Sequence, residues 1–347
     1  MCQYSADDGS MTDWHTVHLG TFACSGAGLF VVEKTNVTRE GRITPGCTGL
    51  YSDENETAMA RAVQVYRGIT KNPIGIQIGH AGRKASSHPP FKGGKPLGPQ
   101  DSPWQTLAPS AIPFGEGWHV PHELSLTELR GLIDSYVAAI ERSKRIGFDV
   151  VELHCAHGYL LHQFLSPLSN RRADAYGKDR MKFPLEVAHA VREAWPKDRG
   201  LGIRINATDW VDGGWQPENA VEYAKALKRA GFDFICVSSG ATVPHARIPV
   251  APGYQVGFAE KVRKEAAVPT RAVGMIADPE QAEEILASGK ADMVAMARAF
   301  LDNPRWVWHA AERYGVAIDY PPQYARSRHD VWPGARIARQ GITESST

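Results

Sequence analysis

The chain has 347 residues, 43% of them hydrophobic and 22% charged, and its 39 Lys and Arg residues against 38 Asp and Glu residues give a formal net charge of +1 at pH 7. This near-neutral balance argues against a nucleic acid or a membrane surface as the main partner, and no apolar run reaches the roughly 18–20 residues that span a bilayer. The five cysteines show no paired spacing and the acidic N-terminal stretch lacks the features of a signal or transit peptide, so we expect a cytoplasmic protein.

From residue 25 onward, short apolar runs alternate with amphipathic segments. KRIGFDVVELH (144–154) and KRAGFDFICVS (228–238) illustrate the unit: a helical segment stops at a glycine, and a nearly continuous apolar run follows. The predicted strands lie within 25–34, 73–79, 144–154, 201–208, 228–238, 270–276 and 287–297. The predicted helices cover 54–69, 125–145, 181–195, 217–230, 255–266, 278–288 and 304–314. This alternation predicts an α/β fold with a parallel sheet and right-handed crossovers.

A (β/α)8 TIM barrel needs one strand more than these seven, and we expect the missing first strand before residue 1, because MCQYSADDG reads as the loop after a strand. An open doubly wound sheet is the alternative, but no GxGxxG follows the first strand. The barrel also explains why most predicted strands end in polar or reactive groups, since barrels carry their active sites at that face. These groups are Gln77 and His80, His154 and His157, Arg204, Ser238 and Ser239, and Arg298.

One segment breaks the rhythm of strands and helices. Residues 81–123 contain eight prolines and show no periodicity, and Trp104, Phe114 and Trp118 within them predict a packed excursion, or lid, over the barrel mouth. We therefore predict a single barrel domain over 1–320, with this excursion, and a C-terminal tail over 321–347.

The stretch VELHCAHGYLLHQ (151–163) carries the strongest chemical signal. His154 and His157 could be metal ligands, but no carboxylate or thiolate follows them with ligand spacing. They could also be hydrogen-bonded core histidines. The interpretation we favour is a pair of imidazole N–H donors that polarises a bound carbonyl or nitro oxygen, with Tyr159 as the candidate proton donor.

Other polar residues at strand ends also have structural alternatives. Gln77 could be a satisfied core amide, and Arg204 could be a buried ion-pair partner of Glu152 or Asp209. Arg298 is expected to be buried just past a strand, where it would need an anion nearby.

Two long motifs connect these residues to a known family. GIQIGHAGRKAS (75–86) and FDVVELHCAHGYLLHQFLSPLSNRRADAYG (148–177) resemble the signature stretches of the Old Yellow Enzyme family of FMN-dependent ene-reductases. The N-terminal MCQYSADDG, EGRITPGCTGLYSDEN (40–55) and the stretch from SSGATVP to GFAEKVR (238–263) resemble its thermophilic-like branch, which includes the xenobiotic reductases. The resemblance extends to about residue 326.

The resemblance implies a cofactor site with FMN across the barrel mouth. Gln77 and Arg204 match the positions that bind the pyrimidine end of the flavin. Cys2 matches the cysteine that tunes the flavin potential. Arg298, with the backbone of Gly274 and Ala297, matches the phosphate site, where backbone N–H groups at a turn suit an anion.

The resemblance also implies substrate residues and a reaction. His154 and His157 match the pair that holds the substrate oxygen, Tyr159 matches the proton donor, and Tyr4 matches the tyrosine of the substrate pocket. NADPH, or NADH, would give a hydride to flavin N5, which would pass it to the β-carbon of an enone or maleimide, or to a nitro compound. Tyr159 would then protonate the α-carbon.

Assembly follows from the resemblance as well. A homodimer or homotetramer is expected, and Arg326 in PPQYAR matches an arginine that reaches the neighbouring subunit's active site; the alternative is a basic tail in solvent. Two departures stand out: Ala297 replaces a common glycine, and Lys34 replaces a small residue against the flavin. The competing functions are a degenerate, non-catalytic flavin-binding barrel and a metal-dependent enzyme on the same fold.

Overall fold

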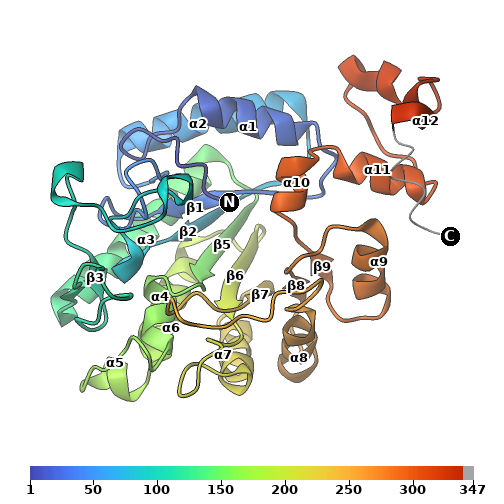
Figure 1. The fold of residues 1–347 in the computed structure, drawn as a ribbon. Helices are drawn as coiled ribbons and strands as arrows, with labels where there is room; N and C mark the ends of the chain where they lie inside the picture. Colours follow the sequence, from blue (N-terminus) through green and yellow to red (C-terminus); the bar gives the residue numbers. More distant parts are fainter. Residues whose placement is uncertain (339–347) are drawn as a thin grey trace.

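The computed structural model describes residues 1–338 and contains one curled parallel sheet (Figure 1). The strands follow one another in chain order, so each is paired with its neighbours in the sequence. They are β1 (Phe30–Asn36), β2 (Ile74–Gly79), β5 (Val150–Cys155), β6 (Gly200–Asn206), β7 (Phe234–Ser238), β8 (Thr270–Ala272) and β9 (Met293–Val294). All seven predicted strands and the α/β barrel-type class are confirmed, although β1 and β9 remain the two edges of the sheet within the described residues.

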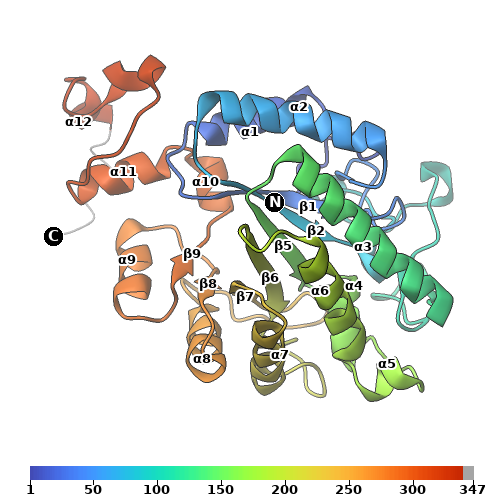
Figure 2. The same ribbon diagram turned by 180° about the vertical axis from the view of Figure 1, so that it is seen from behind.

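Helices that follow the strands form a layer on the outer side of the sheet (Figure 2). The predicted helices are α2 (Asp53–Ile69), α3 (Leu126–Ile146), α6 (Lys182–Ala194), α7 (Pro217–Arg229), α8 (Val256–Ala266), α9 (Pro279–Ala287) and α11 (Trp306–Arg313). The sequence did not predict α1 (Asp13–Ala23), α4 (Leu160–Leu165), α5 (Ala175–Lys178), α10 (Arg298–Asp302) or α12 (Ala335–Ala338). Helices α1, α2, α3, α6, α7 and α8 pack side by side in this order, as a parallel barrel layer requires.

Helix α3 shows how the sequence sets these boundaries. Ser125 accepts a hydrogen bond from the Glu128 backbone N–H at 3.3 Å, and the Glu128 carboxylate accepts from the Ser125 N–H at 2.7 Å, which together form a capping box. The helix ends at Gly147, whose φ of 91° is left-handed. The strand that follows, β5, is buried over most of its length, so the predicted order of helix, glycine and buried strand is observed.

The segment 81–123 packs as a series of short elements. They are η1 (Gly82–Lys84), η2 (Pro90–Lys92), η3 (Pro99–Asp101), β3 (Leu107–Ala108) and β4 (His122–Glu123), with β3 and β4 paired. Trp104 donates from Nε1 to the Glu40 carbonyl at 3.0 Å, and the Arg42 guanidinium lies 5.2 Å from its ring centre. The excursion is therefore packed against residues 40–42.

The C-terminal segment extends away from the sheet. Helix α11, the short helix η4 (Pro322–Ser327) and α12 lie to one side of the barrel in both ribbon views. The boundary between a domain at 1–320 and a tail stays a prediction, and 339–347 of that tail lie outside the described residues. No helix within 1–338 is long and apolar enough to cross a membrane.

Candidate active site

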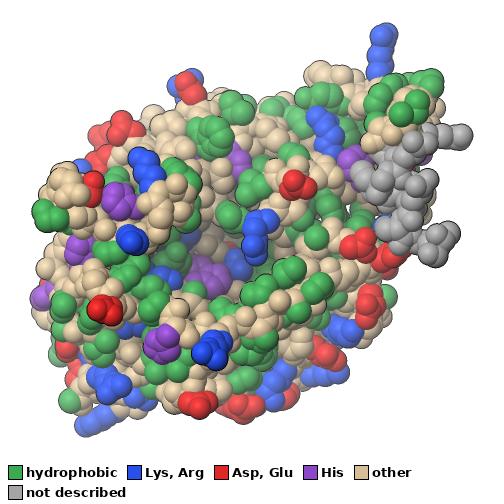
Figure 3. Space-filling view, in the orientation of Figure 1, with side chains coloured by type: hydrophobic (Ala, Val, Ile, Leu, Met, Phe, Trp, Pro, Cys, Tyr) green, Lys and Arg blue, Asp and Glu red, His purple; other side chains and the backbone are tan. Residues whose placement is uncertain are grey.

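The carboxyl ends of the strands surround a hollow in which histidine, lysine and arginine side chains are visible (Figure 3). Strand pairing brings the predicted residues together there. His154 on β5 lies in register with Arg204 on β6, and Gln77 on β2 lies in register with Glu152 on β5. The parallel sheet therefore converts positions far apart in the sequence into neighbours at one face.

The turn after β5 has an unusual backbone that positions the next residues. His157 and Gly158 both have positive φ, at 56° and 67°. Glycine is required at 158, because a Cβ there would lie 2.6 Å from the Ala241 carbonyl oxygen. His157 has a side chain in the left-handed region, which costs on the order of 1–3 kcal/mol and is found most often at functional sites. Tyr159 follows as the N-cap residue of α4.

The third histidine of the motif has a structural role. His162 is fully buried, and its Nδ1 accepts a hydrogen bond from the Gly158 N–H at 2.9 Å. Its Nε2 lies 3.3 Å from the Asp209 carboxylate, which also accepts from Ser166 at 2.6 Å. His162 therefore fixes the turn from below instead of facing the hollow.

His154 is the clearest sign of a binding site. It is 3% exposed, yet neither ring nitrogen has a hydrogen-bond partner among residues 1–338. Its ring centre lies 5.2 Å from those of both His157 and Tyr159. Burial, with His157 and Arg204 nearby, lowers the pKa of His154 well below its ordinary value, so the ring is neutral at neutral pH and carries one N–H.

His157 is held by a neighbouring strand. Its Nε2 lies 2.7 Å from the Ser238 hydroxyl, which donates to Gln255 Oε1 at 3.2 Å and therefore accepts from His157. Burial and the Arg204 charge lower the pKa of His157 well below its ordinary value. The neutral ring thus directs its single N–H at Ser238. His157 can donate to a ligand only when this hydrogen bond to Ser238 is broken.

Tyr159 lies between two cations. The ammonium groups of Lys34 and Lys84 lie 4.9 and 5.1 Å from its ring centre. Burial raises the pKa of Tyr159 well above its ordinary value, so the hydroxyl is protonated at neutral pH. A protonated phenol beside two cations can release its proton to a reacting carbon, because the resulting anion is stabilised.

Lys84 is a site residue that sequence reasoning missed. Its Nζ donates to the His157 carbonyl at 2.9 Å and to the Ala241 carbonyl at 2.8 Å, and so joins the turn after β5 to the loop after β7. Burial lowers its pKa to about 7, and the Arg83 and Lys34 charges add to this effect. The GRKAS stretch of the sequence contains this lysine, but its bonds to the carbonyls of His157 and Ala241 become apparent only in the folded chain.

A bulge in β1 directs Lys34 into the site. Val32 pairs with Ile76, whereas Thr35 pairs with Ile78, so β1 contains one extra residue at this point. Lys34 is 4% exposed, and its Nζ donates to Asn36 Oδ1 and to the Gly41 carbonyl at 3.4 Å. Lys34, which stands where a small residue was expected, is therefore a buried cation beside Tyr159.

Gln77 and Glu152 belong to a polar chain inside the barrel. Gln77 Nε2 donates to Glu152 Oε1 at 2.6 Å, and the other oxygen of Glu152 is paired with the buried Arg271. The Glu152 charge raises the pKa of Arg271 above its ordinary value, although burial opposes it. Arg271 was not predicted as a partner, since its strand lies far from Glu152 in the sequence.

The alternative that Arg204 is a buried ion-pair partner of Glu152 or Asp209 is wrong. Glu152 pairs with Arg271 and Asp209 with His162, while Arg204 makes one hydrogen bond from Nη2, to Ser238 at 3.3 Å. Its Nε has no partner among the described residues. A half-buried cation with free donors fits an acceptor-rich ligand.

The predicted phosphate residues emerge side by side after β8 and β9. Gly274 has a φ of 116°, and a Cβ there would lie 2.8 Å from the Gln255 side chain. Ala297 has a φ of −120°, so its methyl group causes no left-handed strain. The expectation that Arg298 is buried was wrong: it is exposed, because it begins the short helix α10 at the rim and not inside the barrel.

Cys2 and Tyr4 lie in an apolar cluster at one side of the hollow. Both are half-buried and pack with Tyr159 and Trp104 against the buried residues Ile43, Cys47, Ala81 and Ala85. Burial raises the pKa of the Tyr4 hydroxyl, so it is protonated. The N-terminal loop thus reaches the predicted site. Arg326, in contrast, is exposed on η4 in the C-terminal segment.

The residues of the hollow fit FMN. His154, Arg204 and His80, which lie on or just after three neighbouring strands, each have a buried nitrogen without a partner among residues 1–338, and leaving such groups unpaired costs about 1–3 kcal/mol each. A planar ligand rich in oxygen and nitrogen supplies acceptors to these groups. Within residues 1–338, no group of three or more His, Cys, Asp or Glu residues could hold a metal ion, so the metal alternative has no ligand set there.

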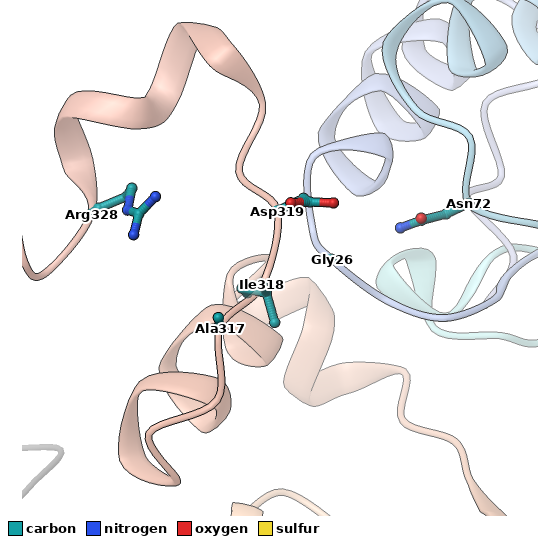
Figure 4. Close-up of a pocket in the computed structure, with 6 residues that line it drawn as sticks. All are labelled: Gly26, Asn72, Ala317, Ile318, Asp319 and Arg328. Atoms are coloured by element: carbon teal, nitrogen blue, oxygen red, sulfur yellow. The ribbon is translucent and has the colours of Figure 1, made fainter.

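A second hollow lies at the opposite, amino ends of β1 and β2 (Figure 4). It is lined by Gly26, Asn72, Ala317, Ile318, Asp319 and Arg328. None of these residues belongs to the predicted site, and this hollow is separate from the one that contains the histidines.

Comparison with known proteins agrees with this geometry. The family model described as NADH:flavin oxidoreductase / NADH oxidase matches residues 1–315. An NADPH dehydrogenase of Geobacillus thermodenitrificans is 43% identical over 334 residues, which cover 94% of this chain and 92% of that protein. An NADPH dehydrogenase of Listeria innocua is 41% identical, covering 94% and 93%. The solved structure of morphinone reductase is 28% identical with a TM-score of 0.74, covering 93% of this chain and 86% of that one.

These matches confirm the resemblance found in the sequence, the enzyme class, and FMN with NAD(P)H as the cofactors. The chain belongs to the NADH:flavin oxidoreductase / NADH oxidase family and is a flavin-dependent oxidoreductase.

Proposed function

We propose that this enzyme uses NAD(P)H to reduce activated C=C bonds, as in enones and maleimides, or nitro compounds, and that Tyr159 supplies the proton. The observation that carries the proposal is His154, a buried neutral imidazole with no partner in the described chain, 5.2 Å from Tyr159 between ring centres. A substrate oxygen on His154 would bring its conjugated carbons close to the phenol.

The cofactor residues we propose lie at the strand ends and turns around the hollow. FMN, when bound, supplies the carrier for hydride between the nicotinamide and the substrate. Arg204 and Gln77 would bind its pyrimidine end, and Arg298 with the backbone of Gly274 and Ala297 would bind its phosphate. Cys2 would lie beside the ring.

His154 and His157 would bind the substrate oxygen. His154 donates with its free N–H, and His157 joins when its Nε2 bond moves from Ser238 to the ligand. Donors aimed at an oxygen that gains charge are worth about 10²–10³ in rate each, because they act in a site from which water is excluded. Tyr4, at the edge of the same cluster, would contact the substrate.

Tyr159 would deliver the proton. Its raised pKa keeps the hydroxyl protonated until the substrate carbon becomes basic, and the ammonium groups of Lys34 and Lys84 stabilise the phenolate that remains. Lys84 would also keep the turn in place through its bonds to the carbonyls of His157 and Ala241.

Assembly and location are further parts of the proposal. We infer a homodimer or homotetramer in which Arg326 reaches a neighbouring site; the C-terminal segment that carries it exposes Val331, Trp332 and Ile337, as an interface would. A cytoplasmic location is supported by five free cysteines, two of which are in contact.

Replacement of Tyr159 by phenylalanine tests the function. Oxidation of NADPH with an enone as acceptor should fall about 10²–10⁴-fold, because the proton donor is lost. Reduction of the bound flavin by NADPH, followed in a stopped-flow instrument, should remain close to wild type, because that half-reaction does not need the phenol.

Tyr136→Phe is the matched control. Tyr136 is a fully buried tyrosine on α3, and its hydroxyl has no partner among residues 1–338, so this change should leave both half-reactions intact. Equal enone reduction by Tyr159→Phe and Tyr136→Phe would refute the role of Tyr159. A chain that binds FMN but reduces neither class of substrate would instead support the degenerate barrel.

A further inference from the structure

Two cysteines from separate segments meet beside the active site. Cys2 packs against the apolar cluster that contains Cys47 and that also includes Tyr4 and Tyr159, and the two thiols influence each other's ionisation. Cys47 is fully buried, whereas Cys2 is half-buried. The proposed reaction uses neither thiol as a reactant.

The backbone holds the two segments together. The Ala6 N–H donates to the Gly46 carbonyl at 2.9 Å, and the Gln3 N–H donates to Glu33 Oε2 at the same distance. A Cβ at Gly46 would overlap the carbonyl of Tyr4, so the N-terminal loop lies directly against the turn that carries Cys47. The contact between the thiols is therefore built into the local fold.

The surroundings favour one thiolate in the pair. Burial alone would raise the pKa of Cys47, but the interaction with Cys2, the Lys34 charge and the Thr44 hydroxyl at 3.5 Å together lower it to about 7, whereas the interaction with Cys47 and burial raise the pKa of Cys2. Burial, in contrast, raises the pKa of Cys155 to about 12. Cysteines become reactive where a hydrogen-bond donor and a nearby cation stabilise the thiolate.

We propose that Cys2 and Cys47 are a reversible redox pair that a hydroperoxide converts to a disulfide. The Cys47 thiolate takes the proton of the half-buried Cys2, and the Cys2 sulfur, now the thiolate, attacks the outer peroxide oxygen; the O–O bond breaks, a sulfenic acid forms on Cys2, and the alkoxide takes the proton from Cys47 to leave as the alcohol. The Cys47 sulfur then attacks the sulfenic sulfur, the S–O bond breaks, and hydroxide leaves as water after protonation. Two thiols and one hydroperoxide thus give one disulfide, one alcohol and one water, and a small-molecule thiol reverses the change.

Oxidation of the holoenzyme with hydrogen peroxide tests this pair. Titration of the denatured protein with a thiol reagent should show the loss of two thiols per chain. Peptide mass spectrometry should find the peptides of Cys2 and Cys47 joined, with two hydrogens lost, and dithiothreitol should restore both thiols. The readout is a covalent bond and not turnover, so it is independent of the proposed function.

Three variants make the test specific. Cys47→Ser should leave a sulfenic acid on Cys2 that dimedone traps, and Cys2→Ser should protect Cys47 from the same concentration of peroxide. Cys24→Ser is the matched control, because Cys24 is a half-buried cysteine outside the cluster, and it should form the disulfide like wild type. The proposal is overturned if Cys2 and Cys47 stay reduced while Cys24 reacts, or if oxidised Cys2 accumulates as sulfenic acid in wild type without a disulfide.

Discussion

At the residue scale, the site combines neutral imidazoles with cations whose charge depends on pH. Burial keeps His154 and His157 neutral, whereas Lys34 and Lys84 lie against the face of Tyr159. Burial, with the Arg83 and Lys34 charges, lowers the pKa of Lys84 to about 7. Its state of charge should therefore control how well the phenolate of Tyr159 is stabilised.

Lys84→Met tests this dependence. The lowered pKa means that the ammonium form is present below about pH 7 and is lost as the pH rises through 7, so enone reduction by the wild type should decline above that pH. The variant should be slower by about tenfold or more below pH 7, and its pH profile should lack the limb near 7, which is measured as kcat/KM between pH 5.5 and 9. A variant that retains the wild-type limb would show that another group titrates there.

The sequence identified most of these residues but not their environments. His154, His157 and Tyr159 were predicted from one contiguous motif, and strand order was sufficient to place Arg204 next to them. The orientation of Lys34 could not be predicted, because it depends on a bulge between β1 and β2. The expected burial of Arg298 was wrong for a similar reason, since the length of β9 decides where the chain leaves the barrel.

At the element scale, the turn between β5 and α4 determines the position of Tyr159, the proposed proton donor. Gly158 can be replaced by alanine only with strain, because φ is 67° and the new Cβ would lie 2.6 Å from the Ala241 carbonyl. Gly147, at the end of α3, has a φ of 91° but no atom within 4 Å of a new Cβ. Alanine substitutions at the two positions therefore distinguish the cost of a positive φ, which both share, from the cost of the steric clash with Ala241, which only Gly158 has.

Gly158→Ala should cost about 1–3 kcal/mol in the free energy of unfolding and reduce enone reduction at least tenfold, because the turn must move away from Ala241. Gly147→Ala should cost about 1 kcal/mol and leave turnover unchanged. Urea unfolding and steady-state kinetics measure both effects. Full activity in Gly158→Ala would mean that the turn does not position Tyr159.

Regular elements were predictable where the pattern was strong. The seven strands of the sheet and seven of the helices were predicted, because the strands are short apolar runs and the helices between them are amphipathic. Helix α1 was not, since its apolar residues do not form a clear stripe and it is held by packing against α2. The small elements of 81–123 also depend on distant contacts, such as that of Trp104 with Glu40.

At the scale of the whole molecule, the C-terminal segment projects from the barrel (Figure 1). Arg326, within this segment, is exposed. The segment's exposed Trp332 and Ile337 are 43% and 76% accessible, which is unusual for large apolar side chains in a monomer. A second copy of the chain would cover them.

Arg326→Ala is therefore expected to raise the KM for the enone several-fold without lowering the melting temperature, because an exposed side chain contributes little to folding. Sedimentation equilibrium should find a dimer or tetramer for both proteins. Arg328→Ala, a change of an exposed arginine two residues away, should leave KM unchanged. Unchanged kinetics of Arg326→Ala in a confirmed oligomer would exclude its contact with a neighbouring site.

The proposed function depends most directly on whether this protein binds a flavin that accepts electrons from NADPH and passes them to an enone. The measurement is the visible absorption spectrum of the purified protein under anaerobic conditions, after addition of NADPH and then of 2-cyclohexenone. Flavin bands should be present, disappear with NADPH and return with the enone. A protein that stays colourless after incubation with FMN, or whose bands do not return with any enone, maleimide or nitro compound, would contradict the account.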